Sequence, residues 1–190
     1  GVHLRGTTEI ADGCTIGPDC TLVDSQVGTG ATVISAHVLQ STIGAGAQVG
    51  PFAYLRPETD LSERAKIGTF VETKKSRIGP GAKVPHLSYI GDADIGEGTN
   101  IGAGNITANY DGFRKHATRI GARVKTGSDC VFVAPVEIGD DAMTAAGSII
   151  TSDIPDGALG IARARQDNKE GFTERAAARA KQAAEEGDGA

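Results

Sequence analysis

Large aromatic side chains are scarce in this sequence of 190 residues, which has no Trp, three Tyr and five Phe. So few rings argue against a wide core of packed aromatics and favour thin layers of small and branched aliphatic side chains. The sequence also lacks any run of 18 apolar residues, which excludes a membrane-spanning helix. It has no cluster of Lys and Arg and a net charge of -5, so neither a membrane nor a nucleic acid is expected as a partner.

Cysteine and methionine are rare as well. Cys14, Cys20 and Cys130 are an odd number without the spacing of metal ligands, so we expect no metal site and a reduced, cytoplasmic setting. No secretory signal is visible. The single Met is Met143 and the first residue is Gly1, which predicts that the chain is a fragment or a processed product.

Glycine and alanine are abundant instead, with 27 of each, and an aliphatic residue followed by Gly recurs along the chain. Most spacings are multiples of six or miss one by a single residue. Filling the gaps predicts inward-facing positions at 10, 16, 22, 27, 33, 38, 43, 49, 55, 61, 67, 73, 78, 84, 90, 95, 101, 120, 126, 132, 138, 144 and 150. Small residues stand two positions before many of them, at Cys14, Ala31, Ser41, Ala47, Ala53, Ala65, Ala82, Ser88, Thr99, Cys130, Ala142 and Ser148.

This repeat predicts the fold from strand geometry. Residues two apart in a strand face the same side, so the small residue and the aliphatic both point inward, the three Cys included. A Gly after the aliphatic permits the bend to the next face. Six residues per face and three faces per coil predict an all-β triangular prism of roughly eight coils, on the order of 38 Å long. Spacing does not set the hand of the coil; resemblance to hexapeptide-repeat proteins implies a left-handed parallel β-helix.

The repeat is interrupted in two places. A polar segment at about 107–119 separates Ile106 from Ile120, and we expect a protruding loop that reaches another surface. After Ile154 the repeat stops, and residues 163–190 are charged and rich in Ala. We therefore expect a β-helix domain over 1–162 and a tail over 163–190, disordered or helical beyond its start.

Several motifs are far more specific than the six-residue repeat. They are GPFAYLRP (50–57), FVETKK (70–75), PHLSYIGDA (85–93), NIGAG (100–104), NYDG (109–112), GSD (127–129) and VAPV (133–136). Over residues 5–172 the chain resembles the C-terminal half of the bacterial bifunctional N-acetylglucosamine-1-phosphate uridyltransferase/glucosamine-1-phosphate acetyltransferases. The uridyltransferase half, with its Gly-rich nucleotide loop and Mg²⁺ site, has no counterpart in this sequence.

The resemblance implies an acetyl-CoA-dependent glucosamine-1-phosphate N-acetyltransferase, a step toward UDP-N-acetylglucosamine for the cell envelope. It implies a homotrimer with sites between neighbouring prisms. The amine arrives largely protonated at neutral pH, so the reaction needs a base, and His is suited to that role. Of the four His, only His86 lies in a family motif, and we expect it to be the general base. Glu72 is a candidate for orienting His86 or the amine.

The remaining candidate residues are assigned to two ligands. For the sugar phosphate, Arg56 and Lys74 supply positive charge, Tyr89 and Asn100 supply hydrogen bonds, and Lys115 can reach a neighbour's site from the loop. For acetyl-CoA, the family pattern implies Ala103, Asn109, Tyr110, Ser128, Ala146, Arg163 and Lys169. Ser128 is a candidate donor to the thioester oxyanion. Phe172 stands where many relatives have Trp.

Four other functions are compatible with a repeat of this kind. Another hexapeptide-repeat acyltransferase, acting on a different amine or hydroxyl, is the nearest. A zinc hydratase on this fold needs three converging His, and His86 and His116 are 30 residues apart. An ice-binding solenoid needs a regular outward Thr ladder, which is absent. A non-catalytic trimerisation module is disfavoured because the motifs run intact through Arg163.

Overall fold

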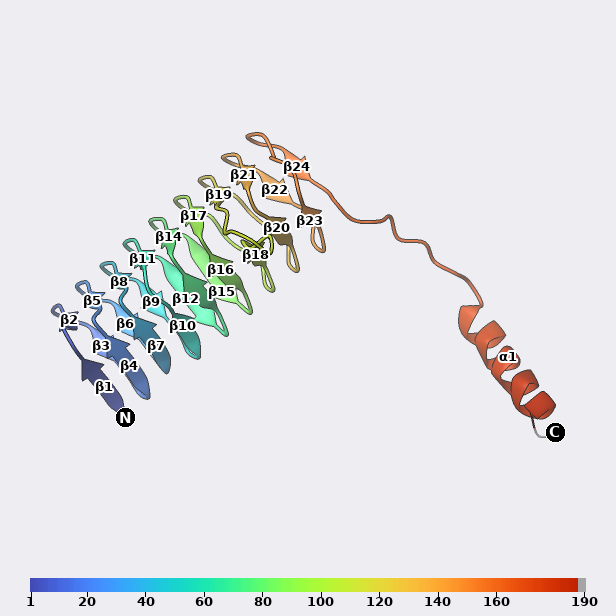
Figure 1. Ribbon diagram of the computed structural model, residues 1–190, viewed down its shortest axis with the longest axis horizontal. Coiled ribbons are helices and arrows are strands. Elements are labelled where there is room, and N and C mark those ends of the chain that lie inside the picture. The colour runs from blue at the N-terminus through green and yellow to red at the C-terminus, as the bar shows by residue number, and fades with distance from the viewer. Residues whose placement is uncertain (188–190) are drawn as a thin grey trace.

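The chain coils into a three-sided prism of parallel strands, followed by a tail that ends in a helix (Figure 1). The computed structural model describes residues 1–187. The predicted left-handed parallel β-helix is confirmed. One face, sheet A, has nine strands: β1 (Val2–Arg5), β4 (Cys20–Val23), β7 (Ala36–Leu39), β10 (Ala53–Leu55), β13 (Glu72–Lys74), β16 (Tyr89–Gly91), β18 (Ile106–Ala108), β20 (Val131–Val133) and β23 (Ile149–Ile150).

Two further sheets close the prism. Sheet B contains β2 (Glu9–Ile10), β5 (Gln26–Val27), β8 (Thr42–Ile43), β11 (Thr59–Leu61), β14 (Ser76–Ile78), β17 (Ala93–Ile95), β19 (Thr118–Ile120) and β21 (Val136–Ile138). Sheet C contains β3 (Thr15–Ile16), β6 (Thr32–Val33), β9 (Gln48–Val49), β12 (Lys66–Thr69) and β15 (Lys83–His86), and continues as β22 (Met143–Thr144) and β24 (Leu159–Gly160). Isolated bridges at Asn100 and Lys125 join these two parts.

The prism is about one coil longer than the repeat predicted. The repeat first became visible at Ile10, but β1 already pairs with β4, with Val2 opposite Cys20 and Leu4 opposite Leu22. Val2 and Leu4 are exposed, since β1 is the edge strand of sheet A and pairs with β4 on one side. The repeat is therefore hardest to recognise in the first coil, where the side chains of the inward positions are only partly buried.

The core is a single column of small and branched side chains. Every predicted inward position from Leu22 to Ile150 is buried, and only Ile10 and Ile16 in the first coil are partly exposed. Cys20 and Cys130 are buried and Cys14 is half-buried, and all three thiols are free. Their Sγ atoms face carbonyl oxygens of the next coil, 3.2 Å away for Cys14 and 3.3 Å away for the other two. The three Cys thus act as small interior side chains.

Glycine is required after the aliphatic residues for a different reason from the predicted bend. Most of these glycines, including Gly44 and Gly96, do not have a positive φ. A Cβ on Gly44 would lie 2.6 Å from the backbone carbon of Ser62, and one on Gly96 would lie 2.5 Å from that of Gly121. These glycines let adjacent coils approach at the edge where sheet B passes into sheet C. The turn itself follows two residues later, where Gly46 and Gly98 have φ near +65°.

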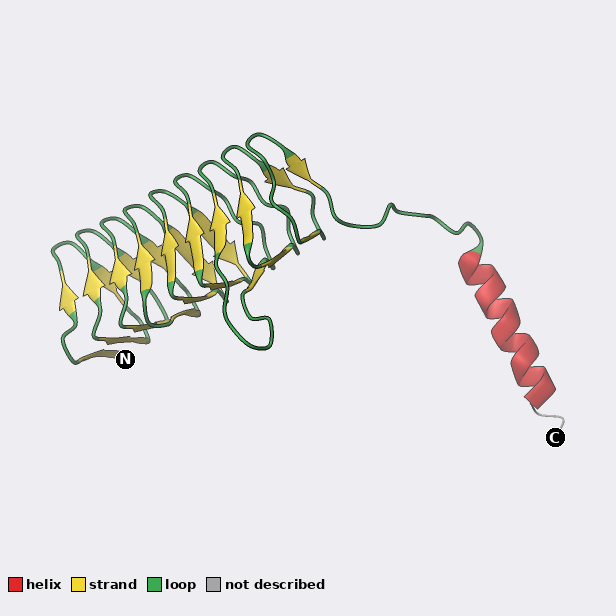
Figure 2. Ribbon diagram, turned by 45° about the horizontal axis from the view of Figure 1, so that its top comes forward, coloured by secondary structure: helices red, strands yellow, loops and turns green. Residues whose placement is uncertain are grey.

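The insertion is shorter than predicted from residues 107–119. Thr107 and Asn109 are buried, so the coil continues through β18 to Asn109, and it resumes at the buried Thr118. Ile106, the residue before the predicted loop, is exposed on the outer side of β18. The protruding segment is therefore 110–117, and it stands out from the side of the prism in Figure 2.

The tail leaves the prism after β24. Residues 163–171 are exposed and lead to helix α1 (Phe172–Gly187), which lies apart from the prism (Figure 2). The side chains described in α1 are all exposed. The predicted tail runs to residue 190, and its residues 188–190 lie outside the described part. No helix in the described chain has the length and apolarity needed to cross a membrane.

Candidate functional site

His86 ends strand β15 at the edge where sheet C passes into sheet A, here called the C–A edge. Its side chain is exposed, and residue 69 of β12 lies beside it in register. Leu87 follows with φ of 50°, and this turn starts the next face. Ser88 points inward and donates to the His86 carbonyl at 2.7 Å. The backbone around the predicted base is thus held by the core, and the imidazole faces outward.

Four residues assigned to chemistry and acetyl-CoA are stacked along the C–A edge. Gly104 N donates to the carbonyl of His86 at 3.3 Å, Asp129 N to that of Ala103 at 2.7 Å, and Gly147 N to that of Ser128 at 2.8 Å. His86, Ala103, Ser128 and Ala146 therefore follow one another at about 4.8 Å per coil. Arg163 flanks this stack, since a Cβ on Gly147 would lie 3.8 Å from its Cδ.

The outer face of sheet A holds the predicted phosphate residues. Arg56 follows β10, and its Nη1 donates to Glu72 Oε1 at 2.8 Å, with both side chains about 40% exposed. This bond raises the pKa of Arg56. Tyr89 lies beside Glu72 in the register of β13 and β16. The described partner of Glu72 is thus Arg56, and its predicted role toward His86 stays a prediction.

Lys74 and Lys115 come together at the root of the protruding loop. The ammonium of Lys115 lowers the pKa of Lys74, burial adds to the effect, and the Asp92 carboxylate opposes it. Two neighbouring ammonium groups repel one another unless an anion lies between them. The pair is therefore suited to a phosphate. Within one chain Lys115 approaches Lys74, and its predicted reach to a neighbour's site stays a prediction.

Asn109 and Tyr110 differ in their surroundings. Asn109 is buried, and its Nδ2 donates to Asp92 Oδ2 and lies 3.5 Å from the Tyr89 hydroxyl. Tyr110 is exposed and donates from its hydroxyl to the Gly112 carbonyl at 2.7 Å. Asn109 is thus close to the sugar-phosphate residues, although the family pattern implied a role toward acetyl-CoA.

Asp111 organises the loop beyond Tyr110. Its Oδ1 accepts from the backbone N of Phe113 and of Arg114, both at 2.7 Å, and its Oδ2 lies 2.7 Å from His116 Nε2. These donors, the Arg114 amide foremost, lower the pKa of Asp111 to about 2. Phe113 is left at the tip with 91% of its surface exposed.

Asn100 and Lys169 lie away from the sheet A residues. Asn100 is exposed on sheet C, where it bridges Lys83 and Lys125 of the adjacent coils. Because sheets A and C are different faces of the prism, Asn100 does not join Arg56 or Lys74 within one chain. Lys169 lies in the exposed tail and pairs with Asp167.

Two side chains of this region had no assigned role in the sequence. Asp92 lies inside the motif PHLSYIGDA, and a charged residue at the corner of a coil was the available signal. Asp111 lies inside NYDG, where Asp followed by Gly is typical of a turn. Neither signal shows which side chains the carboxylate contacts, because those come from an adjacent coil or from across a loop.

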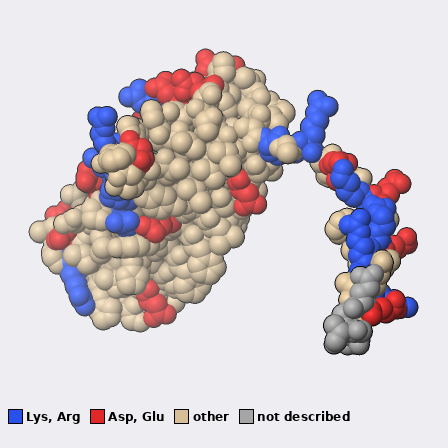
Figure 3. All heavy atoms as spheres, turned by 45° about the vertical axis from the view of Figure 1, so that its right-hand side comes forward, with Lys and Arg blue, Asp and Glu red and all other residues tan. Residues whose placement is uncertain are grey.

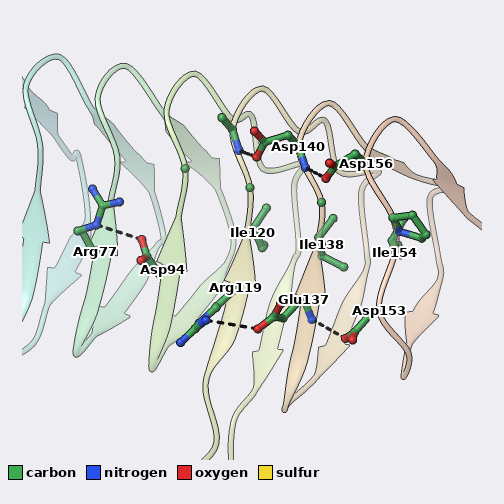
Figure 4. A pocket seen from close by; sticks show the side chains of 15 residues that line it. Arg77, Asp94, Arg119, Ile120, Glu137, Ile138, Asp140, Asp153, Ile154 and Asp156 are labelled. Atoms are coloured by element: carbon green, nitrogen blue, oxygen red, sulfur yellow. Dashed lines mark hydrogen bonds and ion pairs between the residues drawn. The ribbon is translucent and has the colours of Figure 1, made fainter.

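A hollow on sheet B lies away from these residues (Figure 4). Its charged side chains are already paired: Arg77 Nε lies 3.0 Å from Asp94 Oδ1, and Arg119 Nη1 lies 3.4 Å from Glu137 Oε1. None of the predicted site residues lines it. A second hollow lies under the protruding loop and is lined in part by Asp92 and Lys115.

Charge is unevenly distributed over the surface. On the side seen in Figure 3, charged atoms gather toward the margin of the prism and on the tail, and a broad area between them carries few. Within residues 1–187, His, Cys, Asp and Glu form no group of three that suits a metal ion.

The chain is similar to curated bacterial proteins over most of its length. It is 54% identical over 175 residues to the bifunctional protein GlmU of Streptomyces avermitilis and 55% identical to that of Mycobacterium leprae, with 92% of this chain covered. The bifunctional protein GlmU of Corynebacterium glutamicum is 52% identical over 97% of this chain. The chain spans only 36 to 39% of the length of these relatives. No protein-family model matches it.

Solved structures show the same fold at low sequence identity. The UDP-N-acetylglucosamine O-acyltransferase LpxA of Moraxella catarrhalis superimposes with a TM-score of 0.53 at 17% identity, over 92% of this chain and 76% of that one. LpxA of Acinetobacter baumannii gives a TM-score of 0.51 at 16% identity, over 85% of this chain and 69% of that one. At this identity the likeness concerns the fold alone.

Proposed function

This chain belongs to the family of the bifunctional GlmU proteins, and we propose that it transfers the acetyl group of acetyl-CoA to the amine of glucosamine 1-phosphate. The product is N-acetylglucosamine 1-phosphate, which leads toward UDP-N-acetylglucosamine and the cell envelope. We propose no uridyl transfer for these residues, since the prism and tail contain no counterpart of the nucleotide loop. A cytoplasmic location stays a prediction.

The observation that carries the proposal is the grouping of cations on sheet A. Arg56 and Lys74 both lie close enough to the phenol of Tyr89 for it to affect their pKa, and Lys115 of the loop approaches Lys74. A sugar phosphate matches this group, because its dianion balances two ammonium groups and a guanidinium binds it through two oxygens. Tyr89 can donate to the phosphate or to a sugar hydroxyl.

The proposed chemistry is direct transfer. His86 accepts a proton from the ammonium of the sugar, and the free amine attacks the thioester carbonyl of acetyl-CoA. The Ser128 hydroxyl donates to the oxyanion that forms. The carbon–sulfur bond then breaks, and the thiolate of CoA leaves and takes the proton that His86 holds. The nitrogen of the new amide releases the second proton of the former ammonium to solvent. No acyl-enzyme is needed, since the amine attacks the thioester directly and the thiols of Cys14, Cys20 and Cys130 face carbonyl groups of the prism.

The division of predicted residues between two faces supports a site shared by subunits. Arg56, Lys74 and Tyr89 lie on sheet A, whereas Asn100 lies on sheet C. We propose a homotrimer in which sheet C of one copy faces sheet A of the next, so that Asn100 completes a neighbour's site. The stacked His86, Ala103, Ser128 and Ala146 then line the groove that holds acetyl-CoA.

The test of the reaction is thiol release from acetyl-CoA with either glucosamine 1-phosphate or free glucosamine. We expect turnover only with the phosphorylated sugar, because free glucosamine leaves Arg56, Lys74 and Lys115 without an anion. Equal rates with the two sugars would favour another acyltransferase of this fold. Absence of thiol release from a folded trimer would favour a non-catalytic solenoid.

The test of the base is His86→Ala, with His37→Ala as a matched control. His37 is an exposed histidine on β7 whose ring meets Tyr54 edge-on, three coils below the C–A edge position of His86. We expect His86→Ala to lower kcat by about 100-fold or more without changing the oligomeric state. His37→Ala keeps the rate of the unaltered chain. Near-normal turnover in His86→Ala would remove the assignment of the base.

A further inference from the structure

The side chain of Asn109 is clamped by residues of the preceding coil. Asn109 is 7% exposed and is the last residue of the coil before the protruding loop. Its Nδ2 donates to Asp92 Oδ2. A carboxylate only accepts hydrogen bonds, so the nitrogen and not the oxygen of the amide must face Asp92. The same nitrogen lies 3.5 Å from the hydroxyl oxygen of Tyr89, at the long limit of a hydrogen bond.

Gly91 provides the space in which Asn109 and Tyr89 meet. A Cβ on Gly91 would lie 2.4 Å from the Tyr89 hydroxyl oxygen and 2.7 Å from Asn109 Nδ2. Gly91 is not among the residues with positive φ, so its backbone conformation is open to any residue. The absence of a side chain at Gly91 therefore serves the approach of the phenol to the amide.

Asp92 is itself fixed by the backbone on both sides. It occupies a corner with φ of 49°, its N donates to the Lys74 carbonyl at 2.9 Å, and its carbonyl accepts from Thr118 N at 3.1 Å. The carboxylate thus lies between Lys74 on one coil and Asn109 on the next. The neighbouring Lys115 ammonium lowers the pKa of Lys74, whereas the Asp92 carboxylate raises it.

We propose that Asp92 is a positioning residue for the sugar phosphate: it holds the Asn109 amide against Tyr89 and so fixes where the phenol points. This inference rests on the proposed acetyltransferase function. The donated amide hydrogen occupies a lone pair of the phenol oxygen, which leaves the O–H of Tyr89 directed away from Asn109 and free to donate. Asp92 acts through Asn109 and Tyr89 and does not itself contact the substrate.

The experiment compares Asp92→Gly, Asp92→Asn and Gln40→Gly in the full chain. Gly accepts the positive φ of residue 92 and removes only the side chain, whereas Asn keeps an accepting oxygen and tolerates the same φ. Gln40 has φ of 43° at the same type of corner, three coils earlier, and serves as the matched control. Thermal melting verifies that each variant is folded.

We expect Asp92→Gly to raise the KM for glucosamine 1-phosphate about tenfold, the effect of one lost hydrogen bond, with less than a twofold change in the KM for acetyl-CoA. Asp92→Asn restores most of the loss, and Gln40→Gly resembles the unaltered chain. Gly91→Ala reproduces the Asp92→Gly result by a steric route. An unchanged KM in Asp92→Gly, an equal loss in Gln40→Gly, or no recovery in Asp92→Asn overturns the proposal.

Amide hydrogen exchange separates this inference from the proposed function. Asn109 O accepts from His116 N at 2.9 Å, so release of the Asn109 side chain should speed exchange at residues 109–118. We expect this in Asp92→Gly and not in Gln40→Gly. An unaltered chain without turnover overturns the proposed function alone, whereas unchanged exchange in Asp92→Gly overturns the clamp whether or not the chain is active.

Discussion

At the scale of single residues, the site is a set of polar side chains paired across adjacent coils. Arg56 binds Glu72, Asp92 binds Asn109, and Lys115 approaches Lys74. Each pair joins residues about 16 to 41 positions apart, because one coil takes roughly 17 residues and the loop adds more. A substitution in one strand is therefore felt by a side chain of the next coil.

Arg56 provides the first prediction. Arg56→Ala should raise the KM for glucosamine 1-phosphate about 10- to 100-fold, the cost of losing hydrogen bonds to a charged group. The fold should persist, since Arg56 and Glu72 are both well exposed. Steady-state kinetics measures the effect. Arg64→Ala is the control, because Arg64 pairs at the surface with the adjacent Glu63 and lies outside the predicted site. An equal rise in KM there would contradict a specific phosphate contact.

Asp111 provides a prediction about pH. Its pKa is about 2 in the folded loop, below the ordinary value of 3.8, so the ionised form is favoured by folding. The contribution to loop order is complete above about pH 4 and is lost as the pH falls through 2. The amide NMR signals of Phe113 and Arg114 should therefore move together over this interval.

The control for this pH prediction is Asp111→Asn, which should abolish the shift of both amide signals. Asp60→Asn, on sheet B outside the loop, should leave it intact. Movement of the Phe113 and Arg114 signals near pH 4, with the midpoint of an ordinary carboxyl group, would show that Asp111 does not hold the loop in this way.

At the scale of elements, the edges of the prism use glycine for two different reasons. Gly44 has an ordinary φ, but the adjacent backbone leaves no space for a Cβ. Gly30 has φ of +69°, and no atom lies within 4 Å of where its Cβ would be. Only the second kind is a turn residue in the usual sense. Short strands of two to four residues, β8 among them, are thus kept in register by the close approach of backbones at the edges.

This difference predicts unequal costs for two identical substitutions. Gly30→Ala should lower the free energy of unfolding by about 1 to 2 kcal/mol, the strain of Ala at positive φ. Gly44→Ala should cost roughly 3 kcal/mol or more, because its Cβ meets rigid backbone of the adjacent coil. Urea unfolding followed by far-UV circular dichroism measures both. Equal costs would contradict the crowding at Gly44.

At the scale of the whole molecule, one prism does not contain the whole predicted site. Sheet A presents Arg56, Lys74 and Tyr89, and the C–A edge presents His86, but Asn100 faces outward from sheet C. Nothing within the chain brings the sheet C face to sheet A, because both are outer faces of the same rigid column. In the proposed homotrimer, a second copy of the chain would join these two faces.

Shared sites predict complementation between inactive variants. His86→Ala and Asn100→Ala should each have little activity as pure trimers. Unfolding and refolding an equal mixture should restore about a quarter of the sites, those that take His86 from one variant and Asn100 from the other. Thiol release measures recovery, and sedimentation verifies the trimer. Absence of recovery in mixed trimers would place His86 and Asn100 in the same chain's site.

The column of inward residues was predictable because each coil repeats the same local pattern. The aliphatic and small positions from Leu22 to Ile150 are buried as their spacing indicates. The loop boundaries were less predictable, since Thr107 and Asn109 are polar residues that nevertheless face inward. A polar residue inside the prism is stabilised by a hydrogen bond to an adjacent coil. Thr107, for example, accepts from the backbone N of Gly91 in the preceding coil at 2.7 Å, and a linear pattern does not reveal such a partner.

The fold, the family and the candidate base follow from the sequence, because a repeat of six and a set of motifs are local properties of a chain. The pairing of Asp92 with Asn109, of Glu72 with Arg56 and of Lys115 with Lys74 follows only from the coiled structure. Stacking places residues of successive coils about 4.8 Å apart, and which outward side chains then meet depends on strand register and on where the loop leaves the coil. The chemistry of the site therefore depends on neighbours that are distant in sequence.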